Sequence, residues 1–170
     1  MNLIAGAPLW LLVVLVVALI AGAVEDALRL RISNITCLVV LASGVCAAVV
    51  EGPTVSLWQN AGVFAVILGL GTAAFAAGML GGGDVKLLAA SALWVDFRHA
   101  VWLLAFIFLS GGVLAILYLL SRPLRGQRSK RIPYGIAIAV GALAVIAASR
   151  GLLQHQEHSL PTLKIARPSA

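Results

Sequence analysis

Long apolar runs alternate with short polar stretches along most of the chain. A helix needs about 20 apolar residues to cross a hydrocarbon core of about 30 Å, and most of the runs approach that length. The predicted spans are Leu3 to Val24, Ile35 to Val50, Leu57 to Leu80, Val85 to Val95, Ala100 to Leu120 and Ile132 to Ala148. The pattern therefore predicts an all-α integral membrane protein, built as a bundle of six transmembrane helices.

The span from Val85 to Val95 is short, since its 11 residues form only about 16 Å of helix. The distribution of Lys and Arg, which are enriched in cytoplasmic loops, decides whether it crosses. Six crossings put eight of the 12 Lys and Arg residues on one side, including the loop Arg122 to Arg131. Five crossings would place Arg29 and Arg31 opposite that basic loop. We therefore expect six crossings, with both termini outside the cytoplasm.

Two assignments follow for the ends of the chain. Residues 1–150 form one predicted membrane domain, and residues 151–170 form a polar tail that we expect to be flexible. The apolar run Leu9 to Ile20, followed by Ala21-Gly22-Ala23, could also be a secretory signal with a small-residue cleavage site. Because no basic residue precedes this run and it is long enough to span, we interpret it as part of the first transmembrane helix.

Composition narrows the function classes. With 62% hydrophobic and 11% charged residues, the chain is not a soluble globular domain. The net charge of +6 comes from Lys and Arg residues that lie between the apolar runs, where they set the orientation of the helices in the membrane. They do not cluster on a soluble face, so we expect no nucleic-acid partner. Cys37 and Cys46 lack metal-ligand or disulfide spacing and are expected to pack between helices. There is no HExxH motif, and we expect no metal or other cofactor.

Asp84 follows three consecutive glycines, Gly81 to Gly83, at the edge of an apolar run. Glycine lets the backbone leave the helix and lets a substrate backbone approach. Irregular backbone at membrane depth is tolerated where it is buried in protein or lines a wet cavity. This pattern predicts a loop between the third and fourth helices that carries a functional carboxylate. An ordinary loop with Asp84 and Lys86 among the lipid headgroups is the other interpretation.

Asp26 is a second carboxylate, near the end of the first predicted span, where an ion pair with Arg29 would be a simple structural role. Six crossings place Asp26 and Asp84 at the same membrane face. Two neighbouring carboxylates can share a proton, so that one acts as a base toward water while the other polarises a carbonyl. Glu25 is adjacent, but it projects about 100° away on a helix and lies outside the motif register, so Glu25→Gln is the internal control for the two aspartates.

Three segments resemble the type IV prepilin peptidases. Gly81-x-Gly83-Asp84 with Val85-Lys86-Leu87 is similar to the GxGD motif of that family, and Asp26 with Ile32 and Asn34 is similar to its first aspartate followed by Ile-Pro-Asn. Ile132-Pro133-Tyr134-Gly135 resembles the Pro-Tyr-Gly segment that opens the last helix. The resemblance covers roughly residues 10–148. Ser33 stands where the family usually has proline.

The resemblance implies a membrane-embedded aspartic endopeptidase with Asp26 and Asp84 as its catalytic pair. It implies that Gly81 and Gly83 shape the substrate site and that Lys86 orients substrate or carboxylates. The chain lacks the cysteine-rich insert of the long family members and is more similar to the short branch that serves tight-adherence (Flp) pili.

For that branch, the resemblance implies cleavage after glycine of a short basic leader. The active site would face the cytoplasm from the bacterial inner membrane. The expected partners are prepilins, each with a basic leader and an apolar helix, and membrane lipids.

Two other functions stay open. The aspartates of a small transporter could bind protons or cations within the bundle, although such a protein would need more polar residues deep in its helices. An inactive homologue could bind prepilins as an assembly scaffold, although the intact aspartates argue against it.

Overall fold

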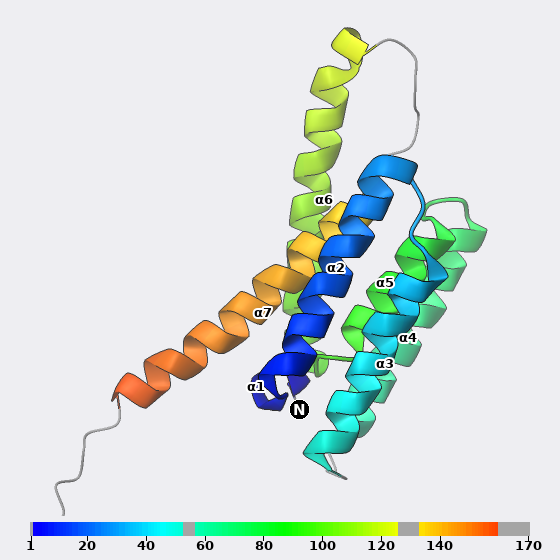
Figure 1. Ribbon diagram of the computed structural model, residues 1–170. Coiled ribbons are helices and arrows are strands. Elements are labelled where there is room, and N and C mark those ends of the chain that lie inside the picture. Colours follow the sequence, from blue (N-terminus) through cyan, green and yellow to red (C-terminus); the bar gives the residue numbers. More distant parts are fainter. Residues whose placement is uncertain (1, 53–56, 126–132, 160–170) are drawn as a thin grey trace, which may run out of the picture.

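The computed structural model describes residues 2–52, 57–125 and 133–159, which form seven helices and confirm the all-α prediction (Figure 1). The helices are α1 Leu3–Gly6, α2 Leu9–Arg29, α3 Asn34–Glu51, α4 Leu57–Ala76, α5 Gly82–Ala92, α6 Phe97–Arg125 and α7 Tyr134–Ser159. Helix α5 packs against α3, α4 and α7, whereas α6 packs chiefly against α7. A short helix therefore occupies the interior of the bundle, and α6 lies at its edge.

Five helices in the described residues are long and apolar enough to cross a membrane. They are α2, α3, α4, the Phe97–Leu120 part of α6 and the Tyr134–Gly151 part of α7. They correspond to five of the six predicted spans. The sixth, Val85 to Val95, corresponds to α5, whose 11 residues are too few for a span by length alone. Six crossings therefore stay a prediction.

The prediction of one continuous helix from Leu3 to Val24 is wrong, because the structure divides this span into two helices. Helix α1 ends at Gly6, and Ala7 and Pro8 have extended backbone before α2 begins at Leu9. The reason is steric, because a proline disfavours helical conformation at the residue before it. Proline also lacks the N–H that would continue the helix.

The ends of α2 and α4 also differ from the prediction. Helix α2 continues past Val24 to Arg29 and ends at Leu30, which has a left-handed φ of 53° and donates its N–H to the Asp26 carbonyl at 2.9 Å. Asp26 therefore lies inside the helix. Helix α4 stops before Leu80, because Gly78 has a φ of 73°. Around Gly78, the N–H groups of Gly78 and Met79 donate to the carbonyls of Phe75 and Ala74, which is a Schellman motif.

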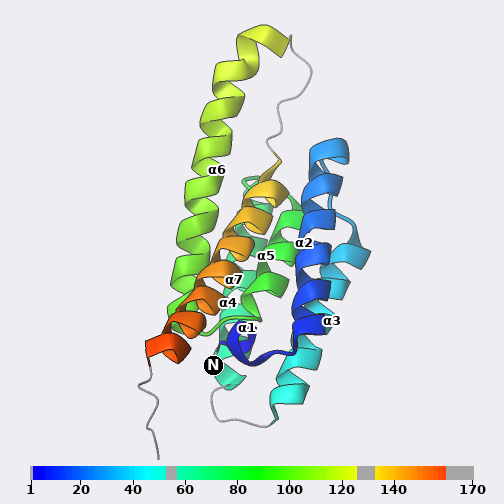
Figure 2. The ribbon, with the colours of Figure 1, turned by 60° about the vertical axis from the view of Figure 1, so that its left-hand side comes forward.

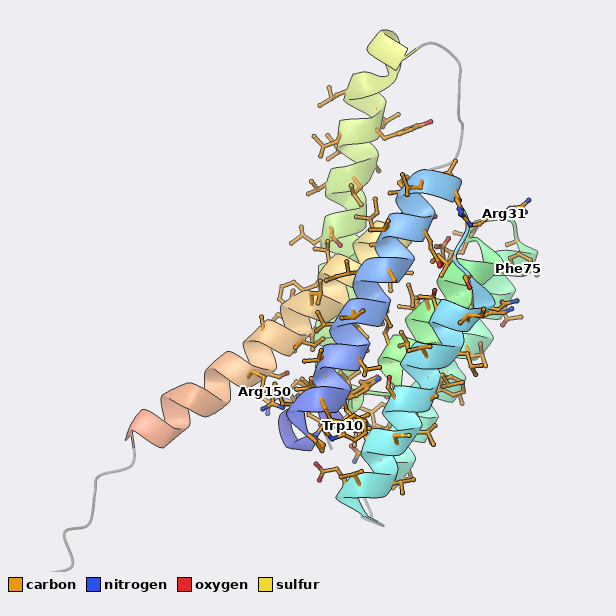
Figure 3. The ribbon with its side chains drawn as sticks, viewed as in Figure 1. Trp10, Arg31, Phe75 and Arg150 are labelled. Carbon is orange, nitrogen blue, oxygen red and sulfur yellow. The ribbon has the colours of Figure 1, made fainter. Side chains whose placement is uncertain are left out.

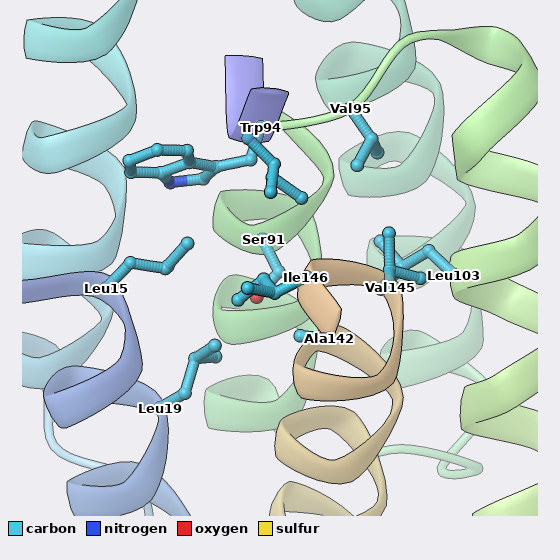
Figure 4. A pocket seen from close by; sticks show the side chains of 10 residues that line it. Leu15, Leu19, Ser91, Trp94, Val95, Leu103, Ala142, Val145 and Ile146 are labelled. Carbon is cyan, nitrogen blue, oxygen red and sulfur yellow. The ribbon is translucent and has the colours of Figure 1, made fainter. Parts of the chain in front are cut away.

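The core is closely packed where α2, α5 and α7 meet (Figure 4). Trp94 is 1% exposed and donates its indole N–H to the Val40 carbonyl at 3.3 Å. A small cavity beside it is lined by Leu15, Leu19, Ser91 and residues of α6 and α7, and its volume is about 10 Å³. That is about the least space that holds one water molecule. This tight core fixes α5 relative to the flanking helices.

The C-terminal helices are longer than expected. Helix α6 begins at Phe97 and α7 runs to Ser159, so α7 continues past residue 150. The division at residue 150 stays a prediction. The greater part of the predicted basic loop, residues 126–131, and residues 160–170 of the predicted tail lie outside the described residues.

The bundle has two distinct ends (Figure 3). Arg31 and Phe75 lie at one end, and Trp10 and Arg150 lie at the other. We call the first the site end, because α2 finishes there at Arg29 and α5 begins there at Gly82. The second is called the opposite end.

Candidate functional site

Asp26 joins two helices that are far apart in the sequence. Its side chain is 4% exposed, and Oδ2 accepts a 2.6 Å hydrogen bond from the backbone N–H of Gly135. Gly135 is the second residue of α7, where backbone N–H groups have no partner within the helix. The N-terminus of a helix also favours a negative charge. Asp26 therefore holds the start of α7, and in the described structure it forms no ion pair with Arg29.

Asp84 lies in the first turn of α5, outside the five candidate spans. The chain is already helical from Gly82, so the predicted loop ends at Gly81 and does not itself carry the carboxylate. Its Oδ2 accepts a 3.3 Å hydrogen bond from the Gly81 N–H. Burial of the carboxyl group, and after it the negative charge of Asp26, raises the pKa of Asp84 to about 6. Gly83, which precedes Asp84, and Gly135, which bonds to Asp26, both pack against Ile32, so the two aspartates lie at the same end of the bundle.

Ile32 lies between three glycines that come from three helices. A methyl group on Gly83 of α5 would lie 3.1 Å from Ile32 Cβ, and one on Gly135 of α7 would lie 2.8 Å from Ile32 Cδ1. On Gly22 of α2 the corresponding distance to Ile32 is 3.9 Å. Gly83 and Gly135 are thus required for close packing, whereas Gly22 is less crowded by Ile32. The sequence motifs included Ile32 and Gly135 but did not reveal that they meet.

Gly81 has a different reason to be glycine. A methyl group there would lie 2.7 Å from Oδ2 of Asp84, too close for the hydrogen bond that orients this carboxylate. Gly82 is less constrained, because its methyl group would be 3.4 Å from the Phe75 ring, an ordinary contact. A side chain at either glycine of the GxGD pattern would therefore crowd its neighbours, whereas one at Gly82 would make only an ordinary contact.

Glu25 closes the turn between α2 and α3, a structural role that its place outside the motifs did not predict. Its Oε2 accepts hydrogen bonds from the Ser33 N–H at 2.8 Å and from the Thr36 hydroxyl at 3.1 Å. The direction of its side chain away from Asp26 is what brings it to this turn. Because the turn carries Ile32, Glu25 supports the packing around both aspartates. Its signal in the sequence was the rarity of acids near apolar runs.

Lys86 donates a 2.9 Å hydrogen bond from Nζ to the side-chain carbonyl of Asn34. The bond links α5 to the first residue of α3. Lys86 is exposed and, within the described part of the chain, forms no ion pair with Asp26 or Asp84. Lys86 thus joins two of the three segments that carried the family resemblance, and a direct role toward substrate stays a prediction.

Cys37 also contacts the glycine segment. Its thiol is buried and lies 3.7 Å from the Gly83 carbonyl oxygen, the geometry of a weak hydrogen bond. Cys46 is exposed on the same helix, and both cysteines are free. Within the described residues, no group of three or more His, Cys, Asp or Glu side chains is placed to hold a metal ion.

A cavity of about 460 Å³ adjoins Asp84. Its walls are mostly apolar and come from α4, α5 and α6, with Tyr134 and Ile138 of α7. A cavity of this size is within the range of binding sites for small molecules or peptide side chains. The site therefore combines two interacting carboxylates with an apolar space beside one of them.

The sequence model of the type IV leader peptidase family matches residues 13–120. This range contains both aspartates and ends before the segment that carries Gly135. No curated protein matched the chain, and no solved structure did.

Proposed function

Because the chain belongs to the type IV leader peptidase family, whose prepilin peptidases are aspartic-type hydrolases, we propose that Asp26 and Asp84 are its catalytic pair. The chain is a multi-pass membrane protein, and its family implies prepilin substrates. The observation that carries this proposal is geometric: Gly135, whose N–H bonds to Asp26, and Gly83, which precedes Asp84, both pack against Ile32, so the two carboxylates lie at one end of the bundle. A third carboxylate, Glu25, is engaged by the α2–α3 turn.

The surroundings of the two aspartates suggest different roles. Asp26 faces the N-terminus of α7, which stabilises a carboxylate, so it is the better base. Asp84 has the raised pKa and is the better acid. Asp26 takes a proton from a water molecule as the water oxygen bonds to the scissile carbonyl carbon, and Asp84 gives its proton to the carbonyl oxygen. The tetrahedral intermediate then collapses: Asp84 takes its proton back as the carbonyl re-forms, the C–N bond breaks, and Asp26 gives the proton from water to the leaving amine.

The remaining site residues position this pair. Gly83 and Gly135 let Ile32 pack against α5 and α7, and Gly81 directs the Asp84 carboxylate. Lys86 fixes the start of α3 through Asn34. In this proposal, Gly81, Gly83 and Lys86 also border the scissile segment of the substrate.

The substrates we propose are Flp-like prepilins. The connections Leu30–Ser33 and Ala77–Gly81 at the site end are short, which favours the branch of the family without an inserted domain. A short basic leader cut after glycine would reach the carboxylates from this end. The enzyme would be placed in the bacterial inner membrane with the site end toward the cytoplasm.

Six crossings are supported by the way α4 and α6 begin together. The rings of Trp58 and Phe97, near the start of each helix, are 5.8 Å apart between centroids. The chain leaves α4 at the site end, so α5 and the residues after it must return to the opposite end before α6. A hydrogen bond at the opposite end agrees with this return, since the Leu3 N–H of α1 donates to the carbonyl of Trp94, just after α5, at 3.1 Å.

Cysteine accessibility tests this topology. A cysteine at Gly126 should be labelled from the cytoplasm and one at His155 from the other side, in a chain lacking Cys37 and Cys46. Labelling of both positions from one side would exclude six crossings.

The catalytic proposal is tested by cleavage of a candidate Flp-like precursor with purified enzyme. Asp26→Asn and Asp84→Asn should each lower the rate by at least about 10²-fold, because an amide keeps the size of the carboxylate but cannot exchange the proton. The two losses should not add, since the pair acts as a unit. Asp96→Asn is the matched control and should cleave normally. Normal cleavage by either site variant would favour the transporter or scaffold.

A further inference from the structure

The cavity beside Asp84 is a groove between α4 and α6. We call it the α4–α6 groove and define it by Asp84, Leu88, Leu104, Phe108, Gly112 and Ala115, with Ala74 of α4 opposite. Helix α6 packs chiefly against α7 and touches α4 at few positions, and it is the least buried of the five candidate spans. Figure 2 shows α6 at the margin of the bundle, with α7 beside it.

The groove leads from the catalytic carboxylate into the membrane region. Asp84 is at the start of α5, and Leu88 lies one turn further from the site end. Along α6, the lining residues from Leu104 to Ala115 extend over about 16 Å of helix. That length is about half of the hydrocarbon core. An occupant that reaches Asp84 would therefore have a long apolar part beside Leu104 and Phe108.

The α6 wall of the groove has little side-chain bulk at its middle. No atom lies within 4 Å of the position where a methyl group on Gly112 would be. Gly111 is backed by Ala137 at 3.6 Å and by the Tyr134 ring. Small residues on a membrane helix let a second helix approach closely. The open surface at Gly112 is therefore suited to a helix backbone.

We propose that the α4–α6 groove holds the apolar helix of the precursor, with Gly112 setting how closely that helix approaches α6. This proposal rests on the proposed function and adds the path of the substrate. The continuity between groove and Asp84 favours a peptide, because a helix that ends at the carboxylates delivers its preceding amide bond to them. A lipid chain would fill the apolar part without using Asp84.

A bulky residue at Gly112 tests the path. Gly112→Leu should reduce cleavage of the precursor at least tenfold, mainly through a higher KM. Gly69→Leu on α4 is the control, because a methyl group there also meets no atom within 4 Å and Gly69 does not line the groove. Gly69→Leu should cleave as the wild type does, with both variants inserted in equal amounts. Normal cleavage by Gly112→Leu would overturn the proposal.

Photo-crosslinking gives a readout that does not depend on turnover. In the Asp84→Asn enzyme, a benzophenone amino acid replaces Phe108, which lines the groove and is 76% exposed, or its neighbour Leu109, which is 67% exposed and does not line it. The precursor should be captured through its apolar helix at 108 and at least tenfold less at 109. Equal capture at both positions, or capture of only phospholipid at 108, would overturn the groove assignment. Failure of the wild-type enzyme to cleave would instead overturn the proposed function.

Discussion

Asp84 at the site end and Asp96 at the opposite end are both carboxylates near a helix start, yet their surroundings differ. Burial and the nearby Asp26 raise the pKa of Asp84 to about 6. Burial would also raise the pKa of Asp96, but hydrogen bonds from the His99 backbone and imidazole outweigh it, and that pKa is lowered. One carboxylate is held beside a like charge, and the other is matched with a basic partner.

The same contrast extends to the other polar groups. At the opposite end, Arg150 donates to the Ala7 carbonyl at 2.9 Å, and Asn2 donates to the Ser149 hydroxyl at 2.9 Å. These bonds fix α1 to α7. At the site end, backbone N–H bonds of 2.6 Å to Asp26 and 3.3 Å to Asp84 hold carboxylates whose charges are not neutralised by an ion pair in the described structure. The proposed function accounts for the difference, since it places the chemistry at the site end and leaves a stabilising role to the opposite end.

After the loss of an aspartate itself, a side chain at Gly135 should reduce precursor cleavage the most. In Gly135→Ala the new methyl group would be 2.9 Å from Asp26 Cβ and 2.8 Å from Ile32 Cδ1. Shifting Asp26 by about 1 Å can cost about 10²-fold in rate, and we expect a loss of that size in precursor cleavage. Gly82→Ala, which meets only an ordinary contact, should lose less than about threefold. Equal rates for the two variants would contradict the packing argument.

Removal of the Glu25 carboxylate should have a smaller effect. Glu25→Ala leaves the Ser33 N–H and the Thr36 hydroxyl without their acceptor, which costs about 1–3 kcal/mol of stability. Looser packing of Ile32 should lower kcat roughly tenfold. Glu25→Gln, which keeps an acceptor oxygen, should fall between Glu25→Ala and the wild type.

The pH dependence separates this positioning role from a catalytic one. Because Glu25 would not exchange a proton in the reaction, the pH profile of kcat/KM for Glu25→Ala should keep the shape of the wild-type profile. A profile that loses one limb would show that Glu25 titrates during catalysis.

Glu25 also marks the limit of what the sequence could predict. Apolar run length predicted the helices, and the motifs identified the end that carries Asp26 and Asp84. The division at Ala7-Pro8 and the stop at Gly78 follow local rules that the sequence contained. The Asp26–Gly135 bond joins residues 109 positions apart, and the packing of Ile32 needs three helices. Such contacts depend on tertiary packing, which no local pattern specifies.

The titration of Asp84 tests, without a cleavage assay, whether the nearby Asp26 distinguishes Asp84 from Asp96. In Asp26→Asn, loss of the negative charge should lower the pKa of Asp84 from about 6, and burial should keep it above its ordinary value of 3.8. Carboxyl carbon NMR of the labelled protein in detergent measures this shift. Asp96→Asn should leave the Asp84 titration unchanged. An Asp84 pKa that stays the same in Asp26→Asn would mean that the two carboxylates do not interact.

The smallest effect is expected for Asp96→Asn. Asparagine keeps the acceptor for the His99 N–H, which Asp96 bonds at 2.9 Å, and loses the charge opposite the imidazole at 2.7 Å. A partly exposed pair of this kind contributes roughly 0.5 kcal/mol, and unfolding in detergent should show a loss of about that size. Because the folded pKa of Asp96 is depressed below 3.8, this contribution is present above that pH and disappears as the pH falls through the folded pKa. Precursor cleavage should be unaffected. A tenfold loss of cleavage in Asp96→Asn with normal unfolding would show that the two ends are not separate in function.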